Sequence, residues 1–302
     1  MPSIRSYAFR PILFTSRSLM ATVARRGVGP MLRSVRLIGR ISEPMTRFPR
    51  GVRVEAGRVS GVPGWWLIPD GAPETVVVLH VHGGAFVTPL AGPLLMVAEL
   101  AASAGLRAFA VDYRLLPDHV YPAAHDDVFN AYRELSQRRL IVVGDSTGSV
   151  LALATLLRAR DAGLPQPLLC VLLSPVVDYG VTEQAFAAND AFVHPLFVVT
   201  GHTAYVNGTD TSVADLSPLG QDLRGLAPIH VVLGEHELVR PEVDRLREAA
   251  QAQGVGVDVR PWPGMWHGWY VMADRLPEGR QALQAAGAVI RAAAAREASP
   301  PA

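Results

Sequence analysis

The sequence of 302 residues predicts an α/β fold, with a mostly parallel central sheet flanked by helices. After about residue 60, short apolar runs alternate with longer amphipathic stretches. The stretches are long enough to be the crossover helices that parallel strands need, and such a sheet carries its chemistry at the carboxyl ends of its strands. The composition, 49% hydrophobic and 18% charged, is that of a globular protein with a sizeable core.

The apolar runs and amphipathic stretches define seven strands and five helices. Strands are expected at residues 64–68, 75–82, 107–113, 139–144, 168–174, 229–233 and 257–262. Helices are expected at residues 93–104, 122–137, 149–162, 241–253 and 278–296. The single cysteine, Cys170, falls in a strand and is expected to fill core space, since it has no partner for an intramolecular disulfide.

Two segments depart from this alternation. Residues 1–45 hold two amphipathic helical patterns, and residues 180–215 form an irregular insertion rich in aromatic side chains. We expect both to pack together as a helical cap over the active face of the sheet. The catalytic core then comprises residues 46–179 and 216–302, and no linker divides it into independent domains.

The charge is distributed unevenly along the chain. All 28 basic residues are arginine, and residues 1–53 contain eleven of them against one acid, Glu43, although the net charge is only +1. We interpret the lack of lysine as a composition bias and expect no nucleic-acid partner. No apolar run reaches eighteen residues, and a secretory signal pattern is absent, so a cytoplasmic location is predicted. Membrane association is not expected; lipid binding by the basic segment is the alternative to a solvated cap helix.

The most informative motif is Gly144-Asp145-Ser146-Thr147-Gly148. It follows an apolar run typical of a strand and precedes a helical stretch, which is the context of a nucleophile elbow. Glycines at both ends allow the helix and strand to approach closely, and the serine hydroxyl then points toward a substrate. Ser146 is the predicted nucleophile.

A second motif, His82-Gly83-Gly84-Ala85-Phe86, comes directly after another predicted strand. Acyl transfer needs hydrogen-bond donors where the carbonyl oxygen becomes negative, and a glycine-rich turn directs successive backbone amides to one point. The residue after the nucleophile supplies a further amide. We expect an oxyanion hole with donors from Gly84, Ala85 and Thr147, in which Gly83 shapes the turn.

The predicted general base is His267, in Pro263-Gly264-Met265-Trp266-His267 after the last strand. Residues 223–243 contain no aspartate, so the acid of the triad is expected to be a glutamate, and two glutamates are candidates. Glu237 is favoured over Glu235, while Glu242 is explained by its position in the first turn of a helix. A zinc site at His236-Glu237 is excluded, since position 240 of the H-E-x-x-H pattern is Arg240.

Together these motifs resemble those of the bacterial hormone-sensitive-lipase-like esterases of the α/β-hydrolase fold. The resemblance extends over most of residues 75–275 and includes the block from Val111 to His119, which contains Asp112, Tyr113 and Arg114. It implies an α/β-hydrolase core with a helical cap. This chain departs from the family pattern at Ala85, where a third glycine is common, and at Thr147, where alanine is usual. Glutamate in place of the common aspartate follows a subset of the family.

The resemblance implies a serine carboxylesterase for short to medium acyl chains, acting on a small-molecule ester through an acyl-enzyme on Ser146 and without metal or cofactor. Expected pocket residues are Phe86, Asp145 and Trp269. A lactonase or acyltransferase would use the same residues, and a ligand-binding protein on the same fold is a more distant alternative. The sequence leaves the natural ester undetermined and a homodimer open.

Overall fold

The computed structural model describes residues 2–42, 48–90, 93–180, 182–187 and 190–296. Its centre is an eight-stranded sheet in the order β1-β2-β4-β3-β5-β6-β7-β8. Strands β3 to β8 run parallel, whereas β2 is antiparallel to both β1 and β4. The strands are β1 (Val52–Val59), β2 (Val62–Pro69), β3 (Val76–Val81), β4 (Arg107–Val111), β5 (Arg139–Asp145), β6 (Leu169–Leu173), β7 (Ile229–Gly234) and β8 (Val257–Trp262).

The seven predicted strands are all present, and β1 is an eighth that was not predicted from the sequence. It is an edge strand in which only Val59 is buried, and its sequence carries no apolar run. Gly57 interrupts it for a packing reason: a Cβ atom there would lie 2.8 Å from Cδ1 of Trp66 on the neighbouring strand. The missing side chain makes room for the indole ring.

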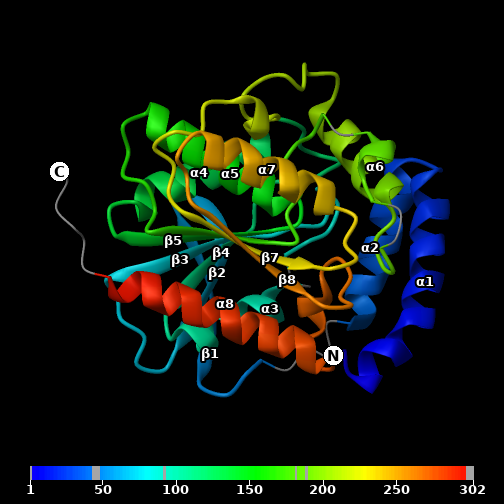
Figure 1. Cartoon of the computed structure of the whole chain (residues 1–302), viewed down its shortest axis with the longest axis horizontal. Coiled ribbons are helices and arrows are strands. Elements are labelled where there is room, and N and C mark those ends of the chain that lie inside the picture. Colours follow the sequence, from blue (N-terminus) through cyan, green and yellow to red (C-terminus); the bar gives the residue numbers. More distant parts are fainter. Residues whose placement is uncertain (1, 43–47, 91–92, 181, 188–189, 297–302) are drawn as a thin grey trace.

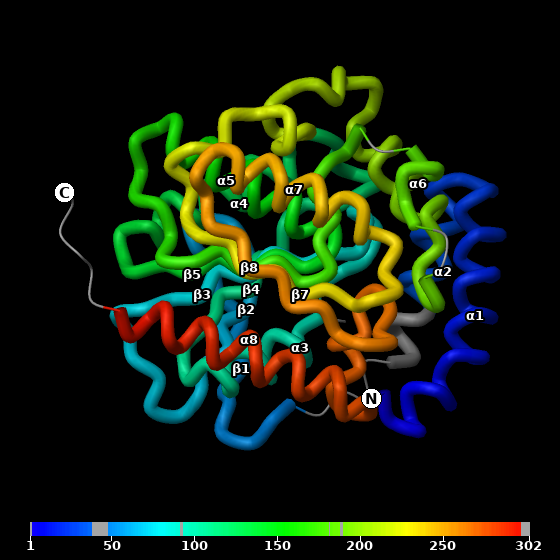
Figure 2. Tube along the Cα trace, in the orientation of Figure 1, coloured from blue at the N-terminus to red at the C-terminus, as the bar shows by residue number. Residues whose placement is uncertain are grey.

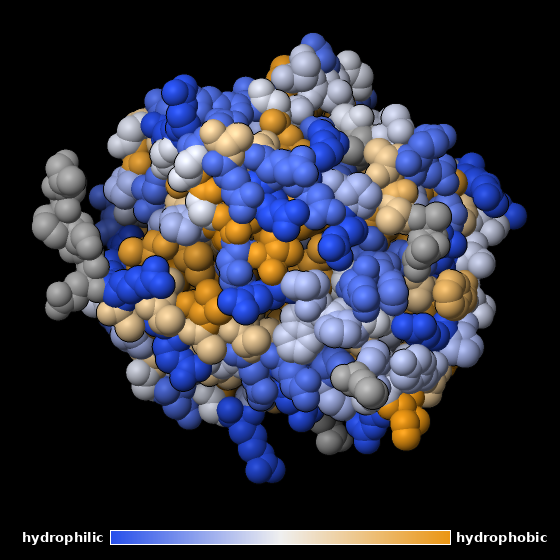
Figure 3. All heavy atoms as spheres, in the orientation of Figure 1, coloured by the Kyte–Doolittle hydropathy of each residue, from blue (hydrophilic) through white to orange (hydrophobic). Residues whose placement is uncertain are grey.

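Helices cover both faces of the sheet (Figure 1). On one face lie α4 (Ala123–Leu135), α5 (Gly148–Asp161) and α7 (Arg240–Ala252), and on the other α3 (Leu94–Ala104) and α8 (Pro277–Ala295). The side chains of β3 alternate between the two resulting cores, with Leu79 in one and Val78 in the other. On the surface, apolar side chains gather between α7 and α8, along the β8 edge of the sheet (Figure 3).

Three further helices, α1 (Ile4–Ala24), α2 (Val28–Ser42) and α6 (Pro195–Val206), pack against one another at one end of the sheet (Figure 2). Helix α6 lies in the insertion that was expected from the sequence to be irregular. Its apolar residues surround the whole helix, so no amphipathic period marks it. The predicted boundary between residues 45 and 46, and Glu43, fall outside the described residues. No helix in the described ranges is long and apolar enough to cross a membrane.

Candidate active site

Ser146 lies on the turn that joins β5 to α5, with a backbone φ of 49°. This left-handed conformation is costly for a residue other than glycine and is typical of strained functional turns. The two flanking glycines are required by close contacts. A Cβ atom on Gly148 would lie 2.1 Å from the carbonyl oxygen of Val81, and one on Gly144 would lie 2.7 Å from Cα of Ser149. The local sequence therefore folds into the expected strand, tight turn and helix.

His267 lies between the serine and a buried glutamate. Its Nε2 atom is 2.9 Å from Oγ of Ser146, and its Nδ1 atom is 3.1 Å from Oε2 of Glu237. His267 follows β8 and Glu237 follows β7, so two loops at the carboxyl end of the sheet supply the pair. The structure thus brings the predicted nucleophile, the predicted base and the favoured acid into one hydrogen-bonded line.

The other candidate acid, Glu235, has a different contact. Its side chain is 53% exposed, and its Oε2 accepts a hydrogen bond from the backbone N–H of Gly264 at 2.8 Å. Glu235 therefore ties the turn that precedes His267 to the β7 loop. In this arrangement the glutamate at the imidazole is Glu237.

A buried hydroxyl holds the second oxygen of Glu237. Oε1 accepts hydrogen bonds from Oγ of Ser174 at 2.7 Å and from the backbone N–H of Gly234 at 2.6 Å, which leaves Oε2 for His267. Ser174 itself has a φ of 47° and accepts a hydrogen bond from the N–H of Gly268. Ser174 was not among the residues expected in the site from the sequence. The available signal was its position directly after a strand, at the same edge as the other candidates.

The charges around His267 change its proton affinity. Burial lowers the pKa of His267, but the hydrogen bond and charge of Glu237, together with the charges of Asp190 and Asp145, raise it above the ordinary 6.5. Burial also raises the pKa of Glu237, against the effects of its hydrogen bonds with His267 and Gly234. The imidazole is thereby favoured as a proton acceptor.

The glycine-rich loop after β3 lies directly against this elbow. A Cβ atom on Gly83 would lie 2.7 Å from Cβ of Ser146, so only glycine permits the approach. Gly84 has a φ of 107°, Ala85 one of 51° and Phe86 one of 62°, so the loop turns through three consecutive residues with positive φ. Thr147, the third expected donor, is fully buried beside the serine. The loop and the elbow therefore meet as the oxyanion-hole prediction requires.

Asp145, expected as a pocket residue, instead packs against the glycine-rich loop and contacts β3. Its carboxylate is buried and Oδ1 lies 2.9 Å from Nε2 of His80 on β3. A Cβ atom on Gly83 would also lie 2.8 Å from Oδ2 of Asp145. His80 was not singled out from the sequence, because a histidine within a strand carries no local signal for a partner on the next strand.

This geometry agrees with comparisons to known proteins. A family model described as the alpha/beta hydrolase fold matches residues 78–271. The chain belongs to this family. It is 34% identical to an acetyl-hydrolase of Streptomyces hygroscopicus over 72% of this chain and 75% of that protein. It is 32% identical to an esterase of Acinetobacter venetianus over 78% of this chain and 82% of that protein.

A solved structure places this alpha/beta hydrolase within a narrower group. The crystal structure of an esterase from the bacterial hormone-sensitive lipase family superposes with a TM-score of 0.81 and 30% identity, covering 92% of this chain and 98% of that chain. The chain is thus a hormone-sensitive-lipase-like member of the alpha/beta hydrolase family, as its motifs predicted.

The two expected aromatic pocket residues of this hydrolase lie in different cores. Phe86 is buried under α6, where its ring stacks on Tyr205 with a centroid distance of 3.6 Å. Trp269 packs instead against Trp262 and Tyr270, in the core that includes α3 and α8. Phe86 therefore joins the glycine-rich loop to α6, and Trp269 supports the loop that follows His267.

Both departures from the family pattern are in contact with α6. Oγ1 of Thr147 lies 3.1 Å from Nε2 of His202, and a Cβ atom on Gly201 would lie 2.3 Å from the carbonyl oxygen of Ala85. Burial lowers the pKa of His202 to about 3, so its ring is neutral. The threonine hydroxyl thus has a partner that explains a polar residue at this buried position.

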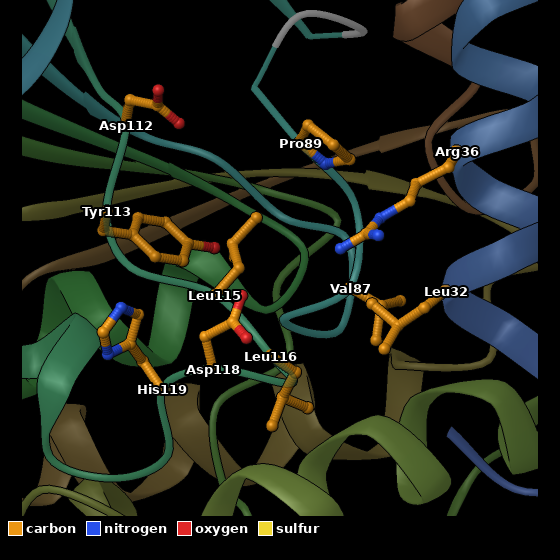
Figure 4. Close-up of a pocket in the computed structure, with 10 residues that line it drawn as sticks. All are labelled: Leu32, Arg36, Val87, Pro89, Asp112, Tyr113, Leu115, Leu116, Asp118 and His119. Carbon is orange, nitrogen blue, oxygen red and sulfur yellow. The ribbon is translucent and has the colours of Figure 1, made fainter. Parts of the chain in front are cut away.

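A cavity of about 260 Å³ opens between α2 and the loops that follow β3 and β4 (Figure 4). Arg36 extends into it from α2, and Asp118 faces it from the β4 loop. Val87 and Pro89, which continue the glycine-rich loop, form another wall. Its lining residues do not include the serine, histidine or glutamate of the hydrogen-bonded line, so this cavity adjoins the candidate site without containing it.

Proposed function

We propose that the protein is a serine carboxylesterase that hydrolyses small-molecule esters with short to medium acyl chains. The observation that carries the proposal is the hydrogen-bonded line from Glu237 through His267 to Ser146, next to the glycine-rich loop. The names of its relatives, an acetyl-hydrolase and esterases, support the same reaction class.

The proposed reaction has two steps. His267 takes the proton of the Ser146 hydroxyl while Oγ attacks the ester carbonyl carbon, and the protonated imidazole then passes that proton to the leaving alcohol. Water attacks the resulting acyl-enzyme by the same cycle, which releases the carboxylic acid and restores Ser146. Glu237 orients the imidazole and stabilises its positive charge.

The tetrahedral intermediate of each step carries a negative oxygen. We assign its stabilisation to the backbone amides of Gly84, Ala85 and Thr147, with Gly83 shaping the loop. In comparable sites, each such donor lowers the activation free energy by on the order of 3 kcal/mol. Because all three are main-chain groups, side-chain substitutions at these positions alter the geometry of the hole rather than remove its donors.

Hydrolysis of p-nitrophenyl esters from acetate to palmitate tests the proposal. The wild type is expected to prefer the shorter chains, and Ser146→Ala to lower kcat roughly 10⁶-fold. Ser136→Ala is a matched control, since this buried serine bonds to the carbonyl oxygen of Arg133 on α4, and its kcat should stay near that of the wild type. A folded wild type that hydrolyses none of these esters would contradict the proposal.

A further inference from the structure

Asp190 is a buried carboxylate in the insertion between β6 and β7 that the proposed reaction does not use. Asp190 is 1% exposed, and both of its carboxylate oxygens accept hydrogen bonds from backbone N–H groups. Oδ1 accepts hydrogen bonds from the N–H groups of Phe192 at 2.8 Å and Val193 at 3.1 Å, which closes a local turn. These two bonds explain how the carboxylate is fixed within its own segment.

The other oxygen reaches two catalytic loops at once. Oδ2 accepts hydrogen bonds from the N–H of His267 at 2.9 Å and from the N–H of Leu238 at 3.1 Å. Leu238 directly follows Glu237, so a single oxygen atom joins the backbones of the proposed acid and the proposed base. The insertion makes a second bond there, from the N–H of Ala187 to the carbonyl oxygen of Leu238 at 2.8 Å.

The charge of Asp190 also affects His267, because it raises the pKa of the imidazole. The charged groups that face His267 are Glu237 from the β7 loop, Asp190 from the insertion and Asp145 from the end of β5. Each favours the protonated imidazole, which is the form that appears while Ser146 attacks. The carboxylate accepts four backbone N–H hydrogen bonds, which replace the hydration that it loses on burial.

We propose that Asp190 is a positioning residue for catalysis, which fixes the backbones of the acid and base loops relative to each other and places a negative charge beside the imidazole. The insertion is then part of the catalytic scaffold as well as a cover. This inference rests on the proposed ester hydrolysis, since it assigns Asp190 a role in the same site.

The test compares kcat, KM and the pH profile for p-nitrophenyl acetate in the wild type, Asp190→Asn and Asp210→Asn. Asparagine has nearly the same shape but no charge, and its NH₂ group opposes one pair of backbone N–H donors. We expect Asp190→Asn to lower kcat at least about 10-fold with KM within about 3-fold. The acid limb of kcat/KM should move down by about 0.5 to 1 pH unit, because the imidazole loses a stabilising charge.

Asp210→Asn is the matched control. Asp210 belongs to the same insertion and accepts a hydrogen bond from the N–H of Ser212 at 2.9 Å, but it is exposed. Its variant should keep the wild-type kcat and acid limb. A folded Asp190→Asn enzyme with kcat within about 2-fold of wild type and an unmoved acid limb would overturn the inference, even if its melting temperature falls.

If the Asp190→Asn variant does not fold, Asp190→Glu, which keeps the charge, is measured in its place. Its longer side chain should displace both loops and lower kcat, while the acid limb stays at the wild-type pH; wild-type kcat in this variant would also overturn the inference. Inactive wild-type protein would instead count against the proposed esterase function, so the two failures are distinguishable.

Discussion

The insertion that contains α6 and the N-terminal pair α1–α2 cover the same end of the sheet, but they contact the site through different groups. The insertion reaches it with buried polar side chains: Asp190 bonds to the backbone of His267, and His202 bonds to Thr147. Helix α1 reaches the loop before His267 through Arg10, whose Nη2 donates to the carbonyl oxygen of Gly264 at 3.1 Å, and otherwise through apolar packing such as that of Leu13.

This difference predicts a division of roles. Buried polar contacts are directional and costly to leave unpaired, so they can fix catalytic groups in position. Apolar packing contributes stability without specifying the orientation of a particular polar group. Substitutions in α1 should therefore change stability more than catalysis, whereas those at the contacts of the insertion should change both.

The largest stability effect is expected from Leu13→Ala. Leu13 is 3% exposed and belongs to the core that includes Met265 and Trp266. Truncation should lower the free energy of unfolding by about 3 kcal/mol because it leaves a cavity. Denaturant unfolding measures this loss, and kcat for p-nitrophenyl acetate should remain within about 2-fold of wild type. A drop in kcat as large as that predicted for Asp190→Asn would remove the distinction between the two regions.

Glu242→Gln tests how a buried carboxyl group next to the start of the insertion affects stability. Glu242 on α7 is 1% exposed and its Oε2 accepts a hydrogen bond from the N–H of Val177 at 2.9 Å, just before the insertion begins. Burial raises its pKa from 4.5 to about 8. The folded state therefore binds this proton more tightly than the unfolded state, so the wild type loses stability as the pH rises from the unfolded-state pKa toward about 8.

Glutamine mimics the protonated form, and the variant should be more stable than wild type at pH 8 by about 2 kcal/mol, but equal at pH 4. Thermal unfolding at the two pH values measures the difference. An advantage of the variant that is the same at pH 4 and pH 8 would show that the proton on Glu242 is not its source.

The smallest expected effect is the loss of stability in Thr147→Val compared with Thr15→Val. Thr147→Val keeps the side-chain shape but leaves buried Nε2 of His202 without its partner, which should cost about 1 to 2 kcal/mol of stability. Because Thr147 also supplies a proposed oxyanion donor, kcat should fall several-fold. The matched variant Thr15→Val on exposed α1, where Oγ1 donates to the carbonyl oxygen of Pro11, should change neither quantity appreciably. Equal losses in both variants would argue against a special contact at His202.

Local motifs account for the features that were predicted well. The elbow requires only a strand, two glycines around Ser146 and a helix, and all of these are contiguous in the sequence. The glycine-rich loop is equally local, since its left-handed residues follow a strand end. Strands β3, β5, β6 and β7 were marked by apolar runs because all of their residues but one are buried, whereas β1 at the sheet edge has only one buried residue and lacked that signal.

Contacts between distant segments could not be predicted. Glu235 and Glu237 lie in the same loop, and the choice between them depends on Ser174, which follows β6 and holds one oxygen of Glu237. Asp190 gives no sign of its role in its own sequence context, because an aspartate before a turn is ordinary in a loop. Its bond to His267 spans 77 positions and exists only once the insertion has folded over the sheet.

The central claim is that Glu237, His267 and Ser146 act as one catalytic unit. It is tested most directly by kcat/KM for p-nitrophenyl acetate in Glu237→Gln beside Glu235→Gln. We expect Glu237→Gln to lose roughly 10³- to 10⁴-fold, because the amide no longer orients or stabilises the imidazolium, while Glu235→Gln loses less than about 3-fold. Equal losses, or a larger loss in Glu235→Gln, would contradict the assignment.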